Sequence, residues 1–310
     1  MPSALVTGAA GFIGSHLVDG LLDRGYRVRG LDNFATGSRA NLTRALEDEQ
    51  FTLVDGDVRD RETVERAMED VESVFHLAAY TSVPGSFERP GFVSAVNCTG
   101  TATVLEMAAD VGVESVVLAS SAAVYGSDAP VPVDESAVPQ PESPYASSKL
   151  YAEQLGEQFT SEFGMDVVSL RFFNVYGPRQ DPEGEYAAVV PTFIELMSEG
   201  KRPVIFGDGE QTRDFVFIED VVRANLAAVE CGVSGVFNVG YGERVSVNEL
   251  VAQLNEILGT ELEPIYDDPR PGDIRHSGAD VSKARDELGL ESTVGLEEGL
   301  GETVAYFGER

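Results

Sequence analysis

The sequence predicts an α/β protein in which a doubly wound parallel sheet is followed by a smaller C-terminal α/β lobe. Strand-like apolar runs alternate with helical patterns along the first half of the chain, and this alternation stops after residue 175. Alternating strands and helices of such lengths form a parallel sheet with right-handed crossovers and helices on both faces. The expected strands are 4–7, 27–32, 51–54, 73–78, 115–120 and 167–172, and the expected helices are 12–24, 60–70, 93–111 and 144–163.

The first expected strand leads into glycines at three-residue spacing, Gly8, Gly11 and Gly14. Glycine at a strand-to-helix turn lets the backbone come close to a ligand. The start of the following helix presents backbone N–H groups without intrahelical partners and the positive end of the helix dipole. The turn is therefore suited to hold a pyrophosphate.

The second expected strand closes on Asp32, eighteen residues after Gly14. An acid at that distance is placed to accept a hydrogen bond from the 2′-hydroxyl of an adenosine ribose. Strand, glycine turn, helix, strand and acid together predict a Rossmann-like dinucleotide site. Because Asp32 would repel a 2′-phosphate, NAD is favoured over NADP, although Arg39 nearby keeps NADP open.

The domain boundary is expected where the alternation stops. Turns rich in glycine, proline and acids, such as 177–182, separate shorter elements from there on. We interpret 1–175, completed by part of 212–240, as the NAD-binding domain, and 176–310 as a discontinuous substrate-binding lobe. No internal repeat or low-complexity linker separates them, so we expect the two lobes to be tightly joined.

The charge of the chain excludes some partners. Acids outnumber Lys and Arg by 53 to 22, for a net charge of −31, and Lys149, Lys201 and Lys283 are the only lysines. Such a surface repels nucleic acid and anionic membranes. We interpret the excess of acids as an adaptation to a high-salt cytoplasm, in which counterions screen their mutual repulsion.

Membrane, secretory and metal-binding classes are not indicated. No apolar run approaches the roughly 18 residues that cross a bilayer, and the first strand begins too early to leave room for a signal peptide. Cys98 and Cys231 have neither disulfide nor metal spacing, so we expect two small buried apolar residues in a reducing cytoplasm. The three histidines show no metal-ligand spacing either: His76 is expected to pack at a strand end, and His16 and His276 have no identifiable partners.

A candidate catalytic pair lies at the start of the expected helix 144–163. Ser143 is a good N-cap and Pro144 suits the first helical position, which puts Tyr145 and Lys149 one turn apart on the same face. An isolated pair of this kind would be an exposed tyrosine and a solvated lysine. Here the lysine stands in a chain that otherwise avoids lysine, and a nucleotide motif and a strand ending in Ser120 and Ser121 precede it. We therefore predict a functional pair.

Taken together, the motifs resemble the extended short-chain dehydrogenase/reductase family and, within it, the nucleotide-sugar 4-epimerases. The resemblance covers nearly the whole chain and rests on 8–14, 32–33, 56–58, 76–79, 97–101, 121–126, the Tyr145 and Lys149 pair, 171–174, 207–209, 212–215 and 270–273. It implies that NAD is bound by Gly8, Gly11, Phe12, Ile13, Gly14, Asp32, Asn33, Asp57, Val58, Leu77, Ala78, Ala79, Asn97, Tyr145, Lys149 and Phe172. It also implies a homodimer formed through the helices 93–111 and 144–163.

The expected chemistry uses Tyr145 as a base. A free phenol has a pKa of about 10, so it needs nearby positive charge, from Lys149 and the nicotinamide ring, to ionise near neutral pH. Tyr145 then takes the proton of a sugar hydroxyl while the carbon beneath gives a hydride to NAD, and Ser121 holds the same oxygen. If the ketone turns over, the hydride returns to the opposite face and the centre is inverted.

The residues after Ser121 separate the reaction branches. Relatives that dehydrate or decarboxylate nucleotide sugars carry acids there, whereas this chain has Ala122 and Ala123, which cannot exchange a proton. A 4-epimerase is therefore preferred. Another nucleotide-sugar enzyme (a UDP-glucuronate epimerase or decarboxylase, or a dTDP-sugar dehydratase) stays open, and so does a non-catalytic NAD-binding regulator.

The resemblance also implies a UDP-sugar site. Its residues would be Thr81, Ser121, Tyr145, Asn174, Val189, Phe206, Arg213, Arg270 and Ser277, with the two arginines on the diphosphate and Phe206 near the uracil. The stretch 179–191 resembles the subgroup that handles N-acetylhexosamines. Ser277, at a position where bulky residues restrict the pocket, is small, so UDP-GlcNAc and UDP-GalNAc are expected substrates, alone or alongside UDP-Glc and UDP-Gal.

Overall fold

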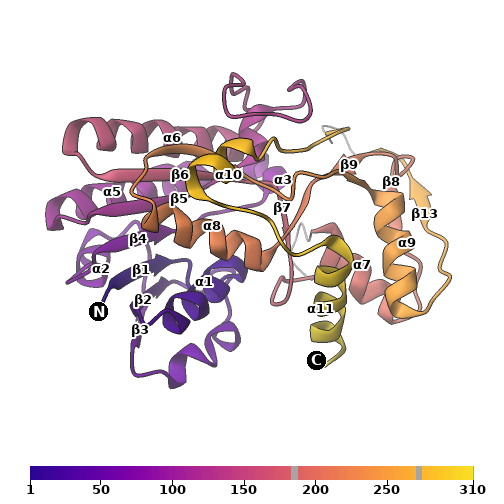
Figure 1. Cartoon of the computed structure of the whole chain (residues 1–310), viewed down its shortest axis with the longest axis horizontal. Coiled ribbons are helices and arrows are strands. Elements are labelled where there is room, and N and C mark those ends of the chain that lie inside the picture. The colour runs from indigo at the N-terminus through magenta and orange to yellow at the C-terminus, as the bar shows by residue number, and fades with distance from the viewer. Residues whose placement is uncertain (183–187, 270–273, 310) are drawn as a thin grey trace.

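The computed structural model describes residues 1–182, 188–269 and 274–309. Its centre is a seven-stranded sheet in the order β11-β6-β5-β4-β1-β2-β3, in which every neighbouring pair is parallel (Figure 1). The strands are β1 (Ser3–Thr7), β2 (Arg27–Asp32), β3 (Phe51–Asp55), β4 (Ser73–His76), β5 (Ser115–Ser121), β6 (Asp166–Phe172) and β11 (Gly235–Val239). The chain builds outward from β1 to β3 and then crosses back to β4, so the carboxyl ends of β1 and β4 flank the point where the order reverses. This is the expected doubly wound α/β fold, and the prediction of its class is confirmed.

Alternate residues of the strands supply the two faces of the sheet. Val6 and Val117 belong to one buried apolar cluster, while Leu5 and Val116 belong to another. The first face is covered by α1 (Phe12–Asp23) and α8 (Ile218–Glu230), which pack on each other, and the second by α2 (Arg61–Ala67), α5 (Gly100–Val111) and α6 (Pro144–Phe163). Strands buried on both faces explain why their sequences are continuous apolar runs.

Two expected elements differ from their predicted form. The helix expected at 93–111 is three consecutive pieces: α4 (Pro90–Val93), a π-helix (Ser94–Thr99) and α5. The wider π turn carries Asn97, whose side chain bonds both the backbone of Tyr80 and Ser148 Oγ, and apolar periodicity does not report such a contact. The strand expected at 73–78 ends at His76, because the next backbone amides, of Leu77 and Ala78, turn back onto Thr7.

The remaining elements lie mostly beyond the carboxyl ends of the sheet strands, where Figure 1 places α7, α9 and α11 side by side. They comprise three two-stranded sheets, β7 (Asn174–Tyr176) with β10 (Phe215–Phe217), β9 (Thr212–Arg213) with β12 (Val245–Ser246), and β8 (Val204–Phe206) with β13 (Ile265–Asp267). The helices here are α7 (Val189–Ser198), α9 (Val247–Leu258) and α11 (Leu296–Gly308), whereas α10 (Ser282–Leu288) packs against β11 and α8. Short helical turns complete the described chain: α3 (Val83–Glu88) and 3₁₀ turns at Arg39–Leu42, Ala45–Glu47 and Ala122–Tyr125.

The cysteine prediction is wrong. Cys231 is exposed and Cys98 is only half-buried. Cys231 is the C-cap residue of α8, and the end of this helix is exposed to solvent there. Both histidines without an identifiable partner in the sequence have one in the fold: His16 Nε2 lies 2.9 Å from the Pro178 carbonyl oxygen, and His276 Nδ1 lies 2.9 Å from Thr212 Oγ1.

None of the helices among the described residues combines the length and the apolar composition that a membrane span requires. Within the same residues, no group of three or more His, Cys, Asp or Glu side chains is arranged to hold a metal ion.

Candidate active site

Helix α6 presents Tyr145 and Lys149 toward the sheet. The helix begins as predicted, with Ser143 Oγ accepting a hydrogen bond from Ala146 N (3.0 Å) and Pro144 in the first turn. Both side chains are buried, with residue exposures of 9% for Tyr145 and 7% for Lys149. Lys149 Nζ donates to the carbonyl of Ala119 on β5 (2.7 Å) and lies 5.7 Å from the centroid of the Tyr145 ring. The solvated lysine of the alternative interpretation is therefore not what the fold contains.

Ser121 joins this pair from the end of β5. Its hydroxyl accepts a hydrogen bond from Ala123 N (3.2 Å) and acts on the Tyr145 phenol to lower its pKa. Ala122 and Ala123 come directly after it in the short 3₁₀ turn. The structure thus brings together the three residues that were predicted to be catalytic, one from the end of β5 and two from one turn of α6.

Burial dominates the ionisation of both residues on α6. It raises the pKa of Tyr145, against which the hydrogen bond to Ser121 acts, and it lowers the pKa of Lys149 to about 8, against which the charge of Glu153 acts. The predicted lowering of the Tyr145 pKa is therefore not achieved by the chain alone. Lys149 does not offset the desolvation of the phenol, so the ionised form depends on further positive charge.

The glycine turn has no room for side chains. Gly8 adopts φ +69°, and a Cβ there would lie 2.8 Å from Ala78 N; a Cβ on Gly14 would lie 2.0 Å from the Gly8 carbonyl oxygen. Helix α1 begins at Phe12, its N-cap Gly11 offers no side-chain hydrogen bond, and its first turn, which the structure describes in full, carries no acid. In so acidic a chain, this uncapped and acid-free helix start fits a pyrophosphate.

Asp32 sits at the end of β2 with 8% exposure and braces the turn. Its carboxylate accepts hydrogen bonds from Ala10 N (2.8 Å) and Phe34 N (2.7 Å). Asn33 donates to Asp57 (2.8 Å), which also forms two hydrogen bonds with the guanidinium of Arg59, and this contact holds the pKa of Asp57 far below its usual range. The predicted ribose-binding acid and the neighbouring Asp57 are therefore both held by hydrogen bonds within the chain.

The other residues predicted to bind the cofactor lie around the same edge. Phe12 and Ile13 open α1, Leu77, Ala78 and Ala79 come after β4, and Phe172 ends β6. Val58 is buried against Gly100. Asn97 is occupied with the backbone of Tyr80 and with Ser148, so in this structure it ties the segment after β4 to α6.

The predicted substrate residues are less closely grouped. Asn174 opens β7 and Arg213 ends β9, where Arg213 Nη1 donates to the Thr212 carbonyl (2.9 Å). Ser277 is half-buried, and its N–H donates to the Thr212 carbonyl (3.0 Å). Thr81 is exposed and Val189 is half-buried at the start of α7. Arg270 lies outside the described residues, as do 183–187 of the stretch 179–191.

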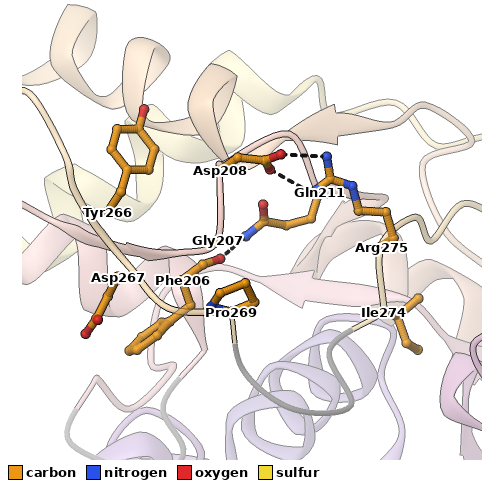
Figure 2. A pocket seen from close by; sticks show the side chains of 9 residues that line it. All are labelled: Phe206, Gly207, Asp208, Gln211, Tyr266, Asp267, Pro269, Ile274 and Arg275. Atoms are coloured by element: carbon orange, nitrogen blue, oxygen red, sulfur yellow. Dashed lines mark hydrogen bonds and ion pairs between the residues drawn. The ribbon is translucent and has the colours of Figure 1, made fainter.

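A cavity of about 620 Å³ opens beside Phe206 (Figure 2). Its wall includes Asp208 and Arg275, which form a two-point ion pair (2.6 and 2.9 Å) that lowers the pKa of Asp208 to about 2. Gln211 Nε2 donates to the Phe206 carbonyl (2.8 Å) behind it. The volume of the cavity suits a small ligand. Sequence reasoning missed Arg275 because its partner is 67 residues away, and no local pattern joins the two.

Asp214 was also missed, although it directly succeeds Arg213. It is completely buried, and its carboxylate accepts hydrogen bonds from the backbone N–H groups of Tyr241 (2.7 Å), Gly242 (3.1 Å) and Ala279 (3.0 Å). Burial nevertheless raises its pKa to about 6. The signal available in the sequence was its place directly after Arg213, inside the motif 212–215.

The family model described as "NAD dependent epimerase/dehydratase family" matches residues 4–240. A putative UDP-glucose 4-epimerase of Methanocaldococcus jannaschii is 41% identical over 304 residues, which is 97% of each chain. The crystal structure of Thermotoga maritima UDP-glucose 4-epimerase with UDP-glucose has a TM-score of 0.95 at 44% identity and covers 99% of both chains. The solved structure of a Methanobrevibacter ruminantium UDP-N-acetylglucosamine 4-epimerase in complex with UDP-N-acetylmuramic acid has a TM-score of 0.96 at 38% identity. It covers 99% of this chain and 98% of the other. The chain belongs to the NAD dependent epimerase/dehydratase family, with NAD as its cofactor.

Proposed function

We propose that the chain is a UDP-hexose 4-epimerase with tightly bound NAD. The observation that carries the proposal is the convergence of Ser121, Tyr145 and Lys149 at the edge of the sheet that also carries the glycine turn. Relatives that match almost the whole chain and are named UDP-sugar 4-epimerases support it.

Each residue of the trio has a separate task. Tyr145 takes the proton of the sugar 4-hydroxyl, and Ser121 hydrogen-bonds that oxygen. Lys149 keeps a positive charge near the phenol while its ammonium group donates a hydrogen bond to the Ala119 carbonyl. Bound NAD would supply the acceptor for a hydride from the sugar carbon and the donor for its return. Because burial raises the Tyr145 pKa in the chain alone, proton removal needs the positive charge of the oxidised cofactor. Turning over the transient 4-keto sugar inverts the centre.

The two residues after Ser121 favour epimerisation over elimination or decarboxylation. Ala122 and Ala123 start the 3₁₀ turn and carry no group that donates or accepts a proton. A dTDP-sugar dehydratase or a UDP-glucuronate decarboxylase needs such a group. A UDP-glucuronate epimerase and a silent NAD-binding regulator remain the alternative functions to be tested.

For the sugar, we propose UDP-GlcNAc and UDP-GalNAc, alongside UDP-Glc and UDP-Gal. Ser277 is small and half-buried, and its side chain is short enough to be compatible with a 2-acetamido group beside it. Phe206 and its cavity are proposed to receive the uracil, and Arg213 and Arg270 the diphosphate. Solved relatives are named for UDP-glucose and for UDP-N-acetylglucosamine, so likeness to them does not separate the two sugar classes.

The organisation of the protein is proposed with the function. The NAD-binding domain comprises 1–175 and part of 212–240, and 176–310 supplies the substrate lobe. A homodimer is proposed through α5 and α6, where Val111, Tyr151 and Phe163 are exposed. The charge of −31 supports a high-salt cytoplasm as the site of action.

The test is product analysis in molar salt. Purified protein is incubated with UDP-GlcNAc, UDP-Glc and UDP-GlcA separately, and the sugar products are resolved, while absorbance of the released cofactor measures bound NAD. We expect C4 inversion of the first two, and loss of at least about 100-fold in kcat for Tyr145→Phe. Tyr26→Phe, in the turn between α1 and β2 and away from both the site and the proposed dimer face, is the control and stays active. Inversion that survives Tyr145→Phe, or turnover of UDP-GlcA alone, contradicts the proposal.

A further inference from the structure

A buried ion pair that the mechanism does not use lies one turn beyond Lys149. Glu153 on α6 and Arg171 on β6 form two hydrogen bonds, from Nε (2.9 Å) and Nη2 (2.7 Å), and each side chain has 4% exposure. Ser120, the neighbour of Ser121 on β5, donates its hydroxyl to the same carboxylate. The pair therefore joins the ends of β5 and β6 to α6 directly under the catalytic residues.

The surroundings of Lys149 contain few charges that could balance it. His76 on β4 is buried between Thr7 Oγ1 (2.8 Å) and Thr101 Oγ1 (3.0 Å), and burial, with Lys149 nearby, lowers its pKa to about 3, so it stays neutral. On α6 itself, Tyr145 is buried with a raised pKa, and Glu153 is the acid one turn away. Among the contacts of the described residues, Arg171 bonds Glu153 and lies over the ring of Tyr125, and it does not contact Lys149 directly.

We propose that Glu153 is a positioning residue for the proposed epimerisation: anchored by Arg171 and Ser120, its carboxylate keeps the buried Lys149 in the ammonium form. The inference rests on the proposed role of Lys149. Two charges one helical turn apart interact strongly when both are buried, because little water screens them. The contribution of Glu153 opposes the effect of burial on the lysine. Because buried ion pairs are often replaceable by apolar residues without loss of stability, packing alone does not explain a charged pair at this place.

The test reads the lysine directly. The chain has three lysines, so protein carrying ¹³C at the lysine ε-carbon gives three titrating signals, assigned with Lys201→Arg and Lys283→Arg. In Glu153→Gln, the amide oxygen can still accept from Arg171 Nε and Ser120, although its NH2 no longer accepts from Arg171 Nη2; we expect the Lys149 midpoint to fall by about one pH unit, with Lys201 unmoved. The matched control Glu157→Gln, exposed on the next turn of α6, leaves Lys149 unchanged. An unchanged Lys149 midpoint in Glu153→Gln overturns the proposal.

A double variant keeps the proposal testable if Glu153→Gln does not fold. Glu153→Leu with Arg171→Met removes both charges, so no unpaired charge is left buried. The Lys149 midpoint should then lie between those of wild type and Glu153→Gln, because the latter leaves Arg171 uncompensated. A wild-type midpoint in the double variant contradicts the proposal.

Turnover gives the second readout. The alkaline limb of the kcat profile should move with the Lys149 midpoint in Glu153→Gln. A uniform loss of kcat at every pH with an unmoved midpoint indicates a purely structural pair and overturns the proposal. If no UDP-sugar is epimerised, the epimerase function fails, while the titration still decides the role of Glu153.

Discussion

The carboxylate of Asp214 accepts a hydrogen bond from the backbone N–H of Ala279 (3.0 Å), 65 residues further along the chain. Its other bonds go to Tyr241 and Gly242, and its own carbonyl accepts from Asn174 N (3.0 Å). Asp214 thereby ties Asn174, Arg213 and the segment that carries Ser277 together. These are three of the residues proposed to bind the substrate, and they come from separate parts of the chain.

We expect Asp214→Asn to loosen this arrangement. The asparagine side chain keeps one oxygen acceptor, but its NH2 group faces backbone N–H groups that need an acceptor. We expect this to lower the free energy of unfolding by about 2 kcal/mol. The KM for the UDP-sugar should rise more than kcat falls. Urea unfolding and steady-state kinetics measure both, with the exposed Asp286→Asn as control.

The pH dependence of stability gives a signature for the same residue. The folded pKa of about 6 exceeds the usual value of 3.8, so the folded state binds the proton more tightly. Stability from this group therefore falls as pH rises from about 4 to about 6. Asp214→Asn should remove that component, and an identical pH profile of unfolding in variant and wild type would count against the raised pKa.

Lys149→Met should abolish turnover and yet stabilise the fold. Burial lowers the folded pKa of Lys149 to about 8 from 10.5, so keeping it charged costs stability at pH 7. After allowing for the lost bond to the Ala119 carbonyl, we expect a gain of about 2 kcal/mol in the free energy of unfolding. The gain should shrink as pH rises from about 8 to about 10, where the wild-type lysine becomes neutral. Denaturant unfolding at pH 7 and pH 10 measures it; a loss of stability at pH 7 would refute the expected cost of the buried charge.

Ser277→Tyr should act on substrate choice. A ring at this position fills the space proposed for the 2-acetamido group, so kcat/KM should fall for UDP-GlcNAc and much less for UDP-Glc. Ser277→Ala, which keeps the side chain small, should leave both unchanged. Competition between the two substrates in one reaction gives the ratio directly, and equal losses on both sugars would show that this position does not set the pocket size.

Molar salt should raise the melting temperature by several degrees over dilute buffer. The excess of 31 negative charges makes the surface repel itself on balance, and the screening length shortens from about 10 Å at 0.1 M to about 3 Å at 1 M. Thermal unfolding is measured in a chloride salt and in a neutral osmolyte of equal osmolality. A rise of the melting temperature in the salt alone shows that charge screening is the cause. A flat melting temperature would remove the support for a high-salt cytoplasm.

Local patterns in the sequence determined the elements and much of the candidate site. The cap at Ser143, the one-turn spacing of Tyr145 and Lys149, and the glycine turn with Asp32 are each encoded within a few consecutive residues, because helix starts and tight turns are decided by neighbouring side chains and backbone. The same holds for the strands, whose apolar runs report burial on both faces.

The tertiary structure alone decided which distant residues meet and how they ionise. Asp208 with Arg275, Asp214 with Ala279, and Glu153 with Arg171 are contacts between separate elements, and the π turn at Asn97 lets its side chain reach Tyr80 and Ser148. Desolvation depends on the groups that pack around a side chain, so the raised pKa of Tyr145 and the exposure of Cys231 result from the fold and are not written in any short stretch of sequence.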